Sequence, residues 1–131
     1  NLRSTTDKVI SVKVSPDVSN KILKDIGSLC SNIPKVLINA GNTKYMKPEQ
    51  VGVDKYNYSM DGGGLSGSPL FKRTLEMVYL FSKFNVPVMA TGGISSFGHI
   101  VAAKSAGASL FGMATSLVLN PYCIPKINSK L

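Results

Sequence analysis

The stretch at residues 86–94 constrains the fold most, because an apolar run there stops abruptly at two glycines. The run reads VPVMA and lacks polar alternation, which is typical of a parallel strand that is buried on both faces. Gly92 and Gly93 follow at its carboxyl end and leave the backbone free of side chains. Ser95 or Ser96 is placed to cap a helix that begins directly afterwards. This order of strand, glycines and helix favours a phosphate site.

A second strand is predicted at residues 109–115, one helix's length further along the chain. In a (β/α)8 barrel, the loops after strands 7 and 8 commonly build the phosphate site. We therefore take the two stretches to be those strands. The expected fold is α/β, the C-terminal half of a (β/α)8 TIM barrel with about four parallel βα units.

The length of 131 residues suits one domain but not a whole barrel, which needs at least roughly 200 residues. We expect residues 1–131 to form a single fragment. The rest of the barrel would lie in another part of the same protein or in a second copy of the chain. The first residue is Asn1 and not methionine, which fits a fragment or a processed product.

The basic excess gives a net charge of +8, but the basic residues do not cluster. A solvated basic surface is therefore expected, and no nucleic-acid partner. Cys30 and Cys123 lack metal-ligand spacing, so no metal site is expected. The sequence has neither a signal peptide nor a long apolar run, and a cytoplasmic location is the expectation.

The remaining pattern alternates strands with helices, and this order argues for parallel strands joined by right-handed crossovers. Residues 44–71 show no convincing helical or strand period and are expected to form a functional loop or lid. His99 is expected to be a surface residue without a partner. The predicted strands are 8–14, 35–40, 86 to the two glycines, and 109–115, and the predicted helices are 19–31, 71–84, 97–106 and 115–119.

Six short motifs resemble, in the same order, the carboxyl-terminal half of a dihydroorotate dehydrogenase, the FMN-dependent barrel enzyme of pyrimidine synthesis. Together they span nearly the whole chain. They are VKVSPD at 12–17, INAGN at 38–42, GGLSG at 63–67, ATGGISS at 90–96, AGAS at 106–109 and AT at 114–115.

The resemblance implies a set of residues that bind FMN. Lys13 would lie beside the N1/O2 edge of the flavin and stabilise the negative charge that appears on reduction. The alternative for Lys13 is a strand lysine that reaches solvent. The implied cofactor residues are Lys13, Ile38, Ser66, Gly67, Gly92, Gly93, Ala114 and Thr115.

The resemblance also implies substrate contacts. Asn39 offers a donor and an acceptor to orotate, the alternative being a cap of the turn that follows its strand. Position 40 usually carries serine or threonine in this family and is Ala40 here, so one substrate hydrogen bond of the family is in question. The family's catalytic base, a cysteine or a serine, belongs to a loop upstream of the Lys13 strand, so no catalytic residue is expected in this chain.

The expected function is FMN-dependent oxidation of dihydroorotate to orotate in de novo pyrimidine biosynthesis. Fumarate is the favoured electron acceptor, in a homodimer of the soluble class. Quinone, with a location at the mitochondrial inner membrane, is the alternative. Two other functions stay open, namely a related flavin barrel acting on a dihydropyrimidine or dihydrouridine, and a non-catalytic degenerate paralogue.

Overall fold

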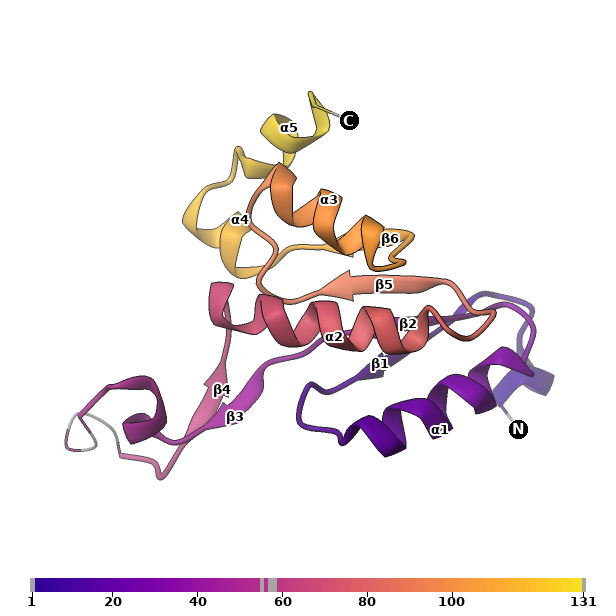
Figure 1. The fold of residues 1–131 in the computed structure, drawn as a ribbon, viewed down its shortest axis with the longest axis horizontal. Helices are drawn as coiled ribbons and strands as arrows, with labels where there is room; N and C mark the ends of the chain where they lie inside the picture. The colour runs from indigo at the N-terminus through magenta and orange to yellow at the C-terminus, as the bar shows by residue number, and fades with distance from the viewer. Residues whose placement is uncertain (1, 55, 57–58, 131) are drawn as a thin grey trace.

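The computed structural model describes residues 2–54, 56 and 59–130 (Figure 1). Its centre is a four-stranded sheet in the order β1-β2-β5-β6, and each neighbouring pair is parallel. β1 and β6 are the outer strands, and neither has a further partner strand among the described residues. The strands are β1 at Ile10–Val14, β2 at Val36–Ala40, β5 at Val88–Thr91 and β6 at Leu110–Gly112.

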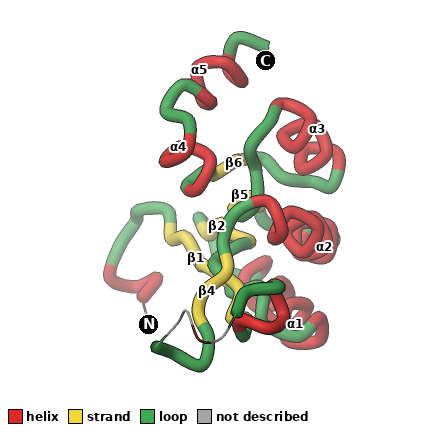
Figure 2. Tube along the Cα trace, turned by 90° about the vertical axis from the view of Figure 1, so that its left-hand side faces the viewer, coloured by secondary structure: helices red, strands yellow, loops and turns green. Residues whose placement is uncertain are grey.

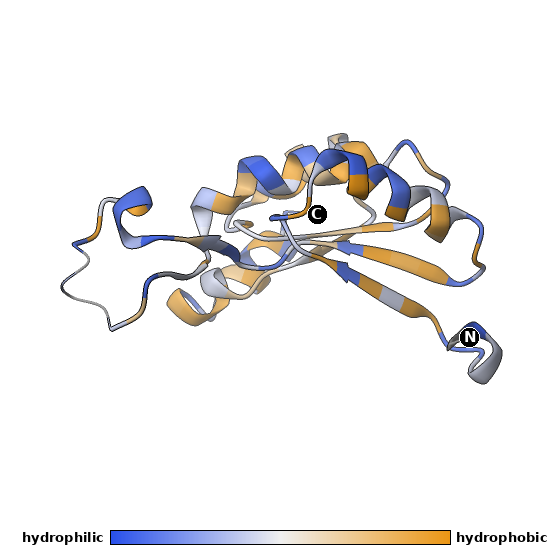
Figure 3. Ribbon diagram, turned by 90° about the horizontal axis from the view of Figure 1, so that it is seen from below, coloured by the Kyte–Doolittle hydropathy of each residue, from blue (hydrophilic) through white to orange (hydrophobic). Residues whose placement is uncertain are grey.

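Helices connect consecutive parallel strands and form one layer against the sheet. Figure 2 shows this layer along one side of the strands, and Figure 3 shows it above the sheet. The connecting helices are α1 at Asn20–Ser31, α2 at Phe71–Phe81 and α3 at Phe97–Ser105. The predicted alternation of strands and helices is therefore confirmed, although α2 ends before residue 84 and β6 is shorter than 109–115.

The strands present two different faces, because successive side chains of a strand point to opposite sides of a sheet. The face toward the helices is the hydrophobic core, where Ile38, Ala40 and Ala90 are fully buried. The opposite face, which we call the inner face, carries Lys13 beside its register partner Asn39. Burial on both faces was expected for β5, but only Val88 and Ala90 are buried, whereas Met89 and Thr91 are partly exposed.

The local end signals of α3 are those the sequence suggested. Ser96 is the N-cap, and its Oγ accepts a hydrogen bond from the backbone N of His99 at 3.2 Å. Gly107 follows the helix with φ 111°, a value that favours glycine. The region between β5 and β6 is thus fixed by local chemistry as well as by packing.

Residues 44–71 are not structureless, and the prediction of an irregular loop was wrong. β3 at Lys44–Met46 pairs antiparallel with β4 at Gly63–Leu65. The short 3-10 helices at Pro48–Val51 and Ser68–Leu70 belong to the same stretch. The hairpin projects beyond the carboxyl ends of the parallel strands (Figure 1). A hollow of about 270 Å³ lies within it and is lined mainly by apolar side chains.

Two short helices close the chain, α4 at Thr115–Leu119 and α5 at Cys123–Asn128. The first was predicted and the second was missed. Pro125 lies within the first turn of α5, where its missing N–H leaves no helical hydrogen bond unmade. A proline in a six-residue helix had concealed it from pattern analysis.

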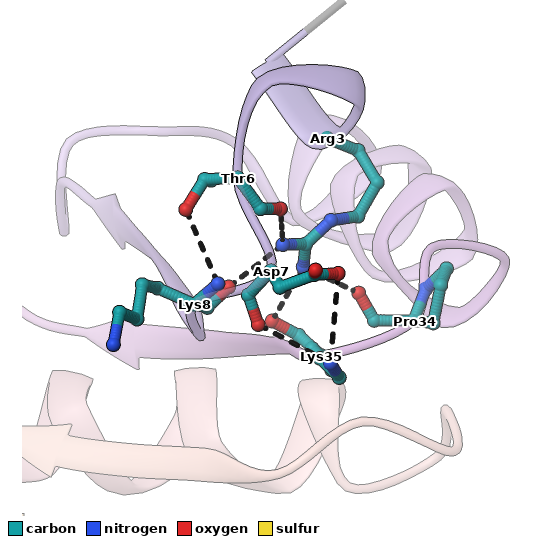
Figure 4. Close-up of polar contacts among 6 residues, drawn as sticks. All are labelled: Arg3, Thr6, Asp7, Lys8, Pro34 and Lys35. Atoms are coloured by element: carbon teal, nitrogen blue, oxygen red, sulfur yellow. Dashed lines mark hydrogen bonds and ion pairs between the residues drawn. The ribbon is translucent and has the colours of Figure 1, made fainter.

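The amino ends of β1 and β2 are tied by Arg3, from the 3-10 helix Leu2–Thr5 (Figure 4). Its Nη1 donates to the carbonyl oxygen of Pro34 at 3.0 Å, and its Nη2 donates to that of Lys8 at 2.8 Å. Nη2 also donates to the carbonyl oxygen of Thr6. These contacts lie at the end of the sheet opposite to the hairpin, so we expect them to serve stability.

Candidate functional site

A cavity of about 170 Å³ lies at the carboxyl ends of the parallel strands. Five separate segments line it, so its shape depends on the whole sheet and on the start of the hairpin. Lys13 is the only charged residue that the described part of the chain contributes to its lining. The lining consists of Lys13, Asn42, Thr43, Gly67, Leu70, residues 91–94 and residues 112–116.

The two glycines after β5 are required by the backbone. Gly92 has φ 130° and Gly93 has φ 71°, both values that side chains disfavour. A Cβ at Gly93 would also lie 2.6 Å from the backbone N of Phe71. The turn therefore packs against the start of α2 on one side and lines the cavity on the other.

Gly41, which follows β2, is required because the backbone of the neighbouring strand lies too close for a side chain. A Cβ there would collide with the carbonyl oxygen of Thr91 on the neighbouring strand. Gly41 also donates its backbone N–H to the carbonyl oxygen of Val14 at 3.2 Å. The glycine of the INAGN motif thus lets three strand ends come together at the mouth of the cavity.

Two buried polar atoms among the described residues have no hydrogen-bond partner, Asn39 Oδ1 and Thr91 Oγ1. An unpaired buried polar atom costs roughly 1–3 kcal/mol, so such atoms usually have a partner when the site is complete. Thr91 lines the cavity, whereas Asn39 lies on the inner face beside Lys13 and outside the cavity lining. These two atoms can therefore form hydrogen bonds with a polar ligand, or with a further part of the protein, at the inner face near the cavity.

Lys13 is exposed and lines the cavity. In the part of the chain that the structure describes, no hydrogen bond or ion pair to its ammonium group is found. A free cation in a concave, glycine-lined site is suited to an anionic ligand. The predicted role of Lys13 beside the flavin stays a prediction, and its position in the cavity lining is compatible with that role.

Most of the other predicted cofactor residues come together around this cavity. Ser66 does not line it, but its Oγ accepts a hydrogen bond from Thr115 Oγ1 at 3.2 Å. Ile38 is fully buried on the helix side, so only its backbone can face a ligand. The lining residues among those predicted are Lys13, Gly67, Gly92, Gly93, Ala114 and Thr115.

The side chain of Ala40 points away from the cavity and toward the helices. It is fully buried, and its methyl group packs in the core beneath the helices. Its side chain therefore does not reach the cavity or the inner face. The place of Ala40 among the predicted substrate-binding positions, next to Asn39, stays a prediction.

Sequence reasoning missed several polar lining residues. Thr91 immediately precedes the glycines and could have been found from its place at a strand end. Asn42 and Thr43 belong to the polar run after β2, which was read as a turn. Ser116 gave no sequence signal, yet its Oγ donates to the carbonyl oxygen of Ile94 at 2.6 Å.

The prediction that His99 has no partner was wrong. Its ring stacks on Phe71 with a centroid distance of 4.1 Å and an interplanar angle of 26°. Its Nδ1 lies 3.2 Å from the backbone N of Ser95 and 3.3 Å from Ser95 Oγ. The sole histidine therefore contacts the turn that follows β5, although it does not line the cavity.

Two further findings bear on the kind of site. Among the described residues, no group of three or more His, Cys, Asp or Glu side chains is arranged to hold a metal ion. In the same residues, no helix combines the length and apolar character needed to cross a bilayer.

A family model described as dihydroorotate dehydrogenase matches residues 1–131. Dihydroorotate dehydrogenase (quinone) of Chloroflexus aurantiacus is 31% identical over 118 residues, which are 88% of this chain and 32% of that protein. The Azorhizobium caulinodans enzyme of the same name is 30% identical over 98% of this chain and 36% of its own length. The mitochondrial quinone enzyme of Oryza sativa is 29% identical over 92% of this chain and 26% of its own length.

Solved structures give the same result for the fold. DHODH from Eimeria tenella in complex with ferulenol superposes with a TM-score of 0.80 at 25% identity, over 92% of this chain and 32% of that chain. The ligand-free form of the same enzyme also gives a TM-score of 0.80. The chain therefore has the α/β architecture of part of a TIM barrel, and it spans about a third of the length of these relatives.

Proposed function

The chain belongs to the dihydroorotate dehydrogenase family, and from this premise we propose that it forms part of a site that oxidises dihydroorotate to orotate in pyrimidine biosynthesis. The catalytic base would come from a part of the protein upstream of β1. Within this chain, the contribution would be to bind the cofactor and to orient the substrate.

The observation that carries the proposal is the cavity at the carboxyl ends of the strands. It combines the single cation Lys13, the left-handed glycine turn after β5 and the unpaired hydroxyl of Thr91. This donor set suits FMN, because backbone N–H groups and hydroxyls can donate to phosphate oxygens, and the Lys13 ammonium can stabilise negative charge on the flavin ring. We propose that FMN is the cofactor.

The cavity volume indicates which part of FMN this chain would hold. At about 170 Å³ it is smaller than a typical cofactor site of roughly 300–1,000 Å³. We therefore assign it to the phosphate end. Gly92, Gly93 and Thr115 would hold that group, with Gly67 and Ser66 beside it. When bound, FMN would supply the two-electron acceptor that oxidation of dihydroorotate requires.

Lys13 and Asn39 would act together on the inner face, where the register of the sheet makes them neighbours. The Lys13 ammonium would stabilise the negative charge that develops during substrate oxidation. The Asn39 amide would donate to and accept from the polar edge of the pyrimidine, and this would satisfy its unpaired Oδ1. Both roles are proposals.

For the second substrate we propose a quinone. The relatives named above are quinone-linked by their printed names, and this supports quinone over the fumarate that the sequence motifs favoured. A quinone acceptor would place the protein at a membrane that contains quinone. The homodimer and the cytoplasmic location stay predictions.

The purified full-length protein tests the proposal directly. It should show the yellow absorbance of bound flavin, which dihydroorotate should bleach under anaerobic conditions. A short-chain quinone should restore the colour, and fumarate should not. A protein that carries no flavin would contradict the proposal and favour a degenerate paralogue. Bleaching by dihydrouracil or dihydrouridine in place of dihydroorotate would also contradict it.

A further inference from the structure

The glycine turn, which we define as residues 92–96, is anchored from two directions. Ser116 Oγ donates to the carbonyl oxygen of Ile94 at 2.6 Å and ties the turn to α4. On the opposite side, the backbone N of Ser95 donates to His99 Nδ1 at 3.2 Å. Both contacts hold backbone atoms of the segment whose residues 92–94 line the cavity.

His99 is itself held in place. Its backbone N donates to the N-cap Ser96, and its ring stacks on Phe71 at 4.1 Å. Phe71 begins α2, and its backbone N is the atom that a Cβ at Gly93 would meet at 2.6 Å. The imidazole thus joins the start of α2, the glycine turn and the start of α3.

We propose that His99 is a positioning residue, which holds the glycine turn in the conformation that receives the phosphate of FMN. This inference rests on the proposed function, because it deepens the same site. Nδ1 acts as the acceptor for Ser95 N–H, so the ring hydrogen is on Nε2. His99 lies outside the cavity lining, so it would act on the phosphate only through the turn.

The affinity for FMN depends on how much of the protein has the glycine turn in the conformation that receives the phosphate. Without the acceptor at position 99, Ser95 N–H would bond to water and the turn would populate other conformations. The apparent dissociation constant then rises by the inverse of the fraction that stays competent. One hydrogen bond of ordinary strength limits this effect to about three- to tenfold.

Two substitutions separate the acceptor from the stacking. His99→Phe keeps an aromatic ring against Phe71 and removes the acceptor, whereas His99→Asn provides an amide oxygen near the position of Nδ1. Both are made in the full-length protein, and the flavin-free form is titrated with FMN and with riboflavin. Riboflavin has the same ring system and lacks the phosphate, so it reports every contact except the one in question.

The expected result is that His99→Phe weakens FMN binding about three- to tenfold and changes riboflavin binding less than twofold. His99→Asn should restore FMN binding to within about twofold of the unsubstituted protein, by keeping that hydrogen bond. If His99→Phe is insoluble, His99→Ala replaces it in the same comparison.

Three results would overturn the inference. They are unchanged FMN binding by His99→Phe, an equal loss of FMN and riboflavin, and a failure of His99→Asn to restore binding. None of them would affect the proposed function, as long as the unsubstituted protein binds FMN. Absence of FMN binding by the unsubstituted protein would instead refute the proposed function and the inference with it.

Discussion

Lys13 on β1 lies directly opposite Asn39 on β2 in the parallel ladder, and both side chains belong to the inner face of the sheet. One neighbour supplies a positive charge and the other an amide with an unpaired, buried oxygen. Because the strands fix this pair, the spacing between the two groups does not depend on a mobile loop.

Replacing Lys13 with alanine should slow flavin reduction by dihydroorotate about a hundredfold, since a charge placed where negative charge develops contributes on that order. Retention of FMN should change much less, because the phosphate end of the cavity is untouched. Rapid-mixing absorbance of the flavin measures the first, and the flavin content after gel filtration measures the second. Lys21→Ala on the exposed surface of α1 is the matched control. Equal reduction rates in the two variants would remove Lys13 from the mechanism.

Replacing Thr91 with valine should weaken FMN binding about three- to tenfold. The threonine hydroxyl has no partner among the described residues and would bind the cofactor, and valine has no such group. The flavin-free protein should keep its stability or gain up to about 1 kcal/mol, since valine carries no polar group to leave unpaired. Titration calorimetry and chemical denaturation give the two quantities. A variant that is less stable without flavin but binds it normally would show that Thr91 pairs with protein and not with cofactor.

Replacing Gly93 with alanine should destabilise the protein by about 2 kcal/mol or more, because φ 71° disfavours a side chain and the new Cβ would press on Phe71. The turn would shift, and FMN should be lost with it. Gly98→Ala in α3 is the control, since its Cβ would meet only Ser96 Oγ at 3.8 Å. That change should stabilise the helix by about 0.5–1 kcal/mol. Thermal unfolding of both variants measures the difference in stability. Similar melting temperatures for Gly93→Ala and Gly98→Ala would contradict the conclusion that the backbone requires glycine at position 93.

Replacing Arg3 with methionine should lower stability by about 1 kcal/mol, because carbonyl oxygens at the amino ends of β1 and β2 lose charged donors in contacts that are exposed to solvent. The turnover number should stay the same within about twofold, since residues at that end of a barrel serve stability. Denaturation and steady-state kinetics on the same preparation test both parts. A large loss of turnover with intact stability would show that this end of the sheet has a functional role. Lys8→Met provides the control, because Lys8 contributes its backbone carbonyl to this contact.

The order of strands and helices followed from the sequence, because long apolar periods and end signals such as Ser96 and Gly107 are local. The sequence also predicts that the side chain of Lys13 lies on the face opposite to Val12 and Val14, since β1 alternates apolar and polar residues. The hairpin could not be found in this way. Its strands have three residues each, and residues 47–62 between them are too many for a turn signal.

Two features of the site depend on contacts that the sequence does not show. Whether the Ala40 side chain faces the inner face or the core depends on which side of the sheet the helices cover, and a run such as VLINA does not reveal this. His99 was judged by its neighbours in sequence, whereas its stacking partner Phe71 comes from another helix. Contacts between elements decided both cases, and a single sequence carries little information about them.

The parallel sheet ends on both sides in a strand with no neighbour among the described residues. Each such border presents a row of backbone donors and acceptors to whatever touches it. In isolation, this chain should therefore associate with other copies of itself through its edge strands, β1 and β6, as its concentration rises.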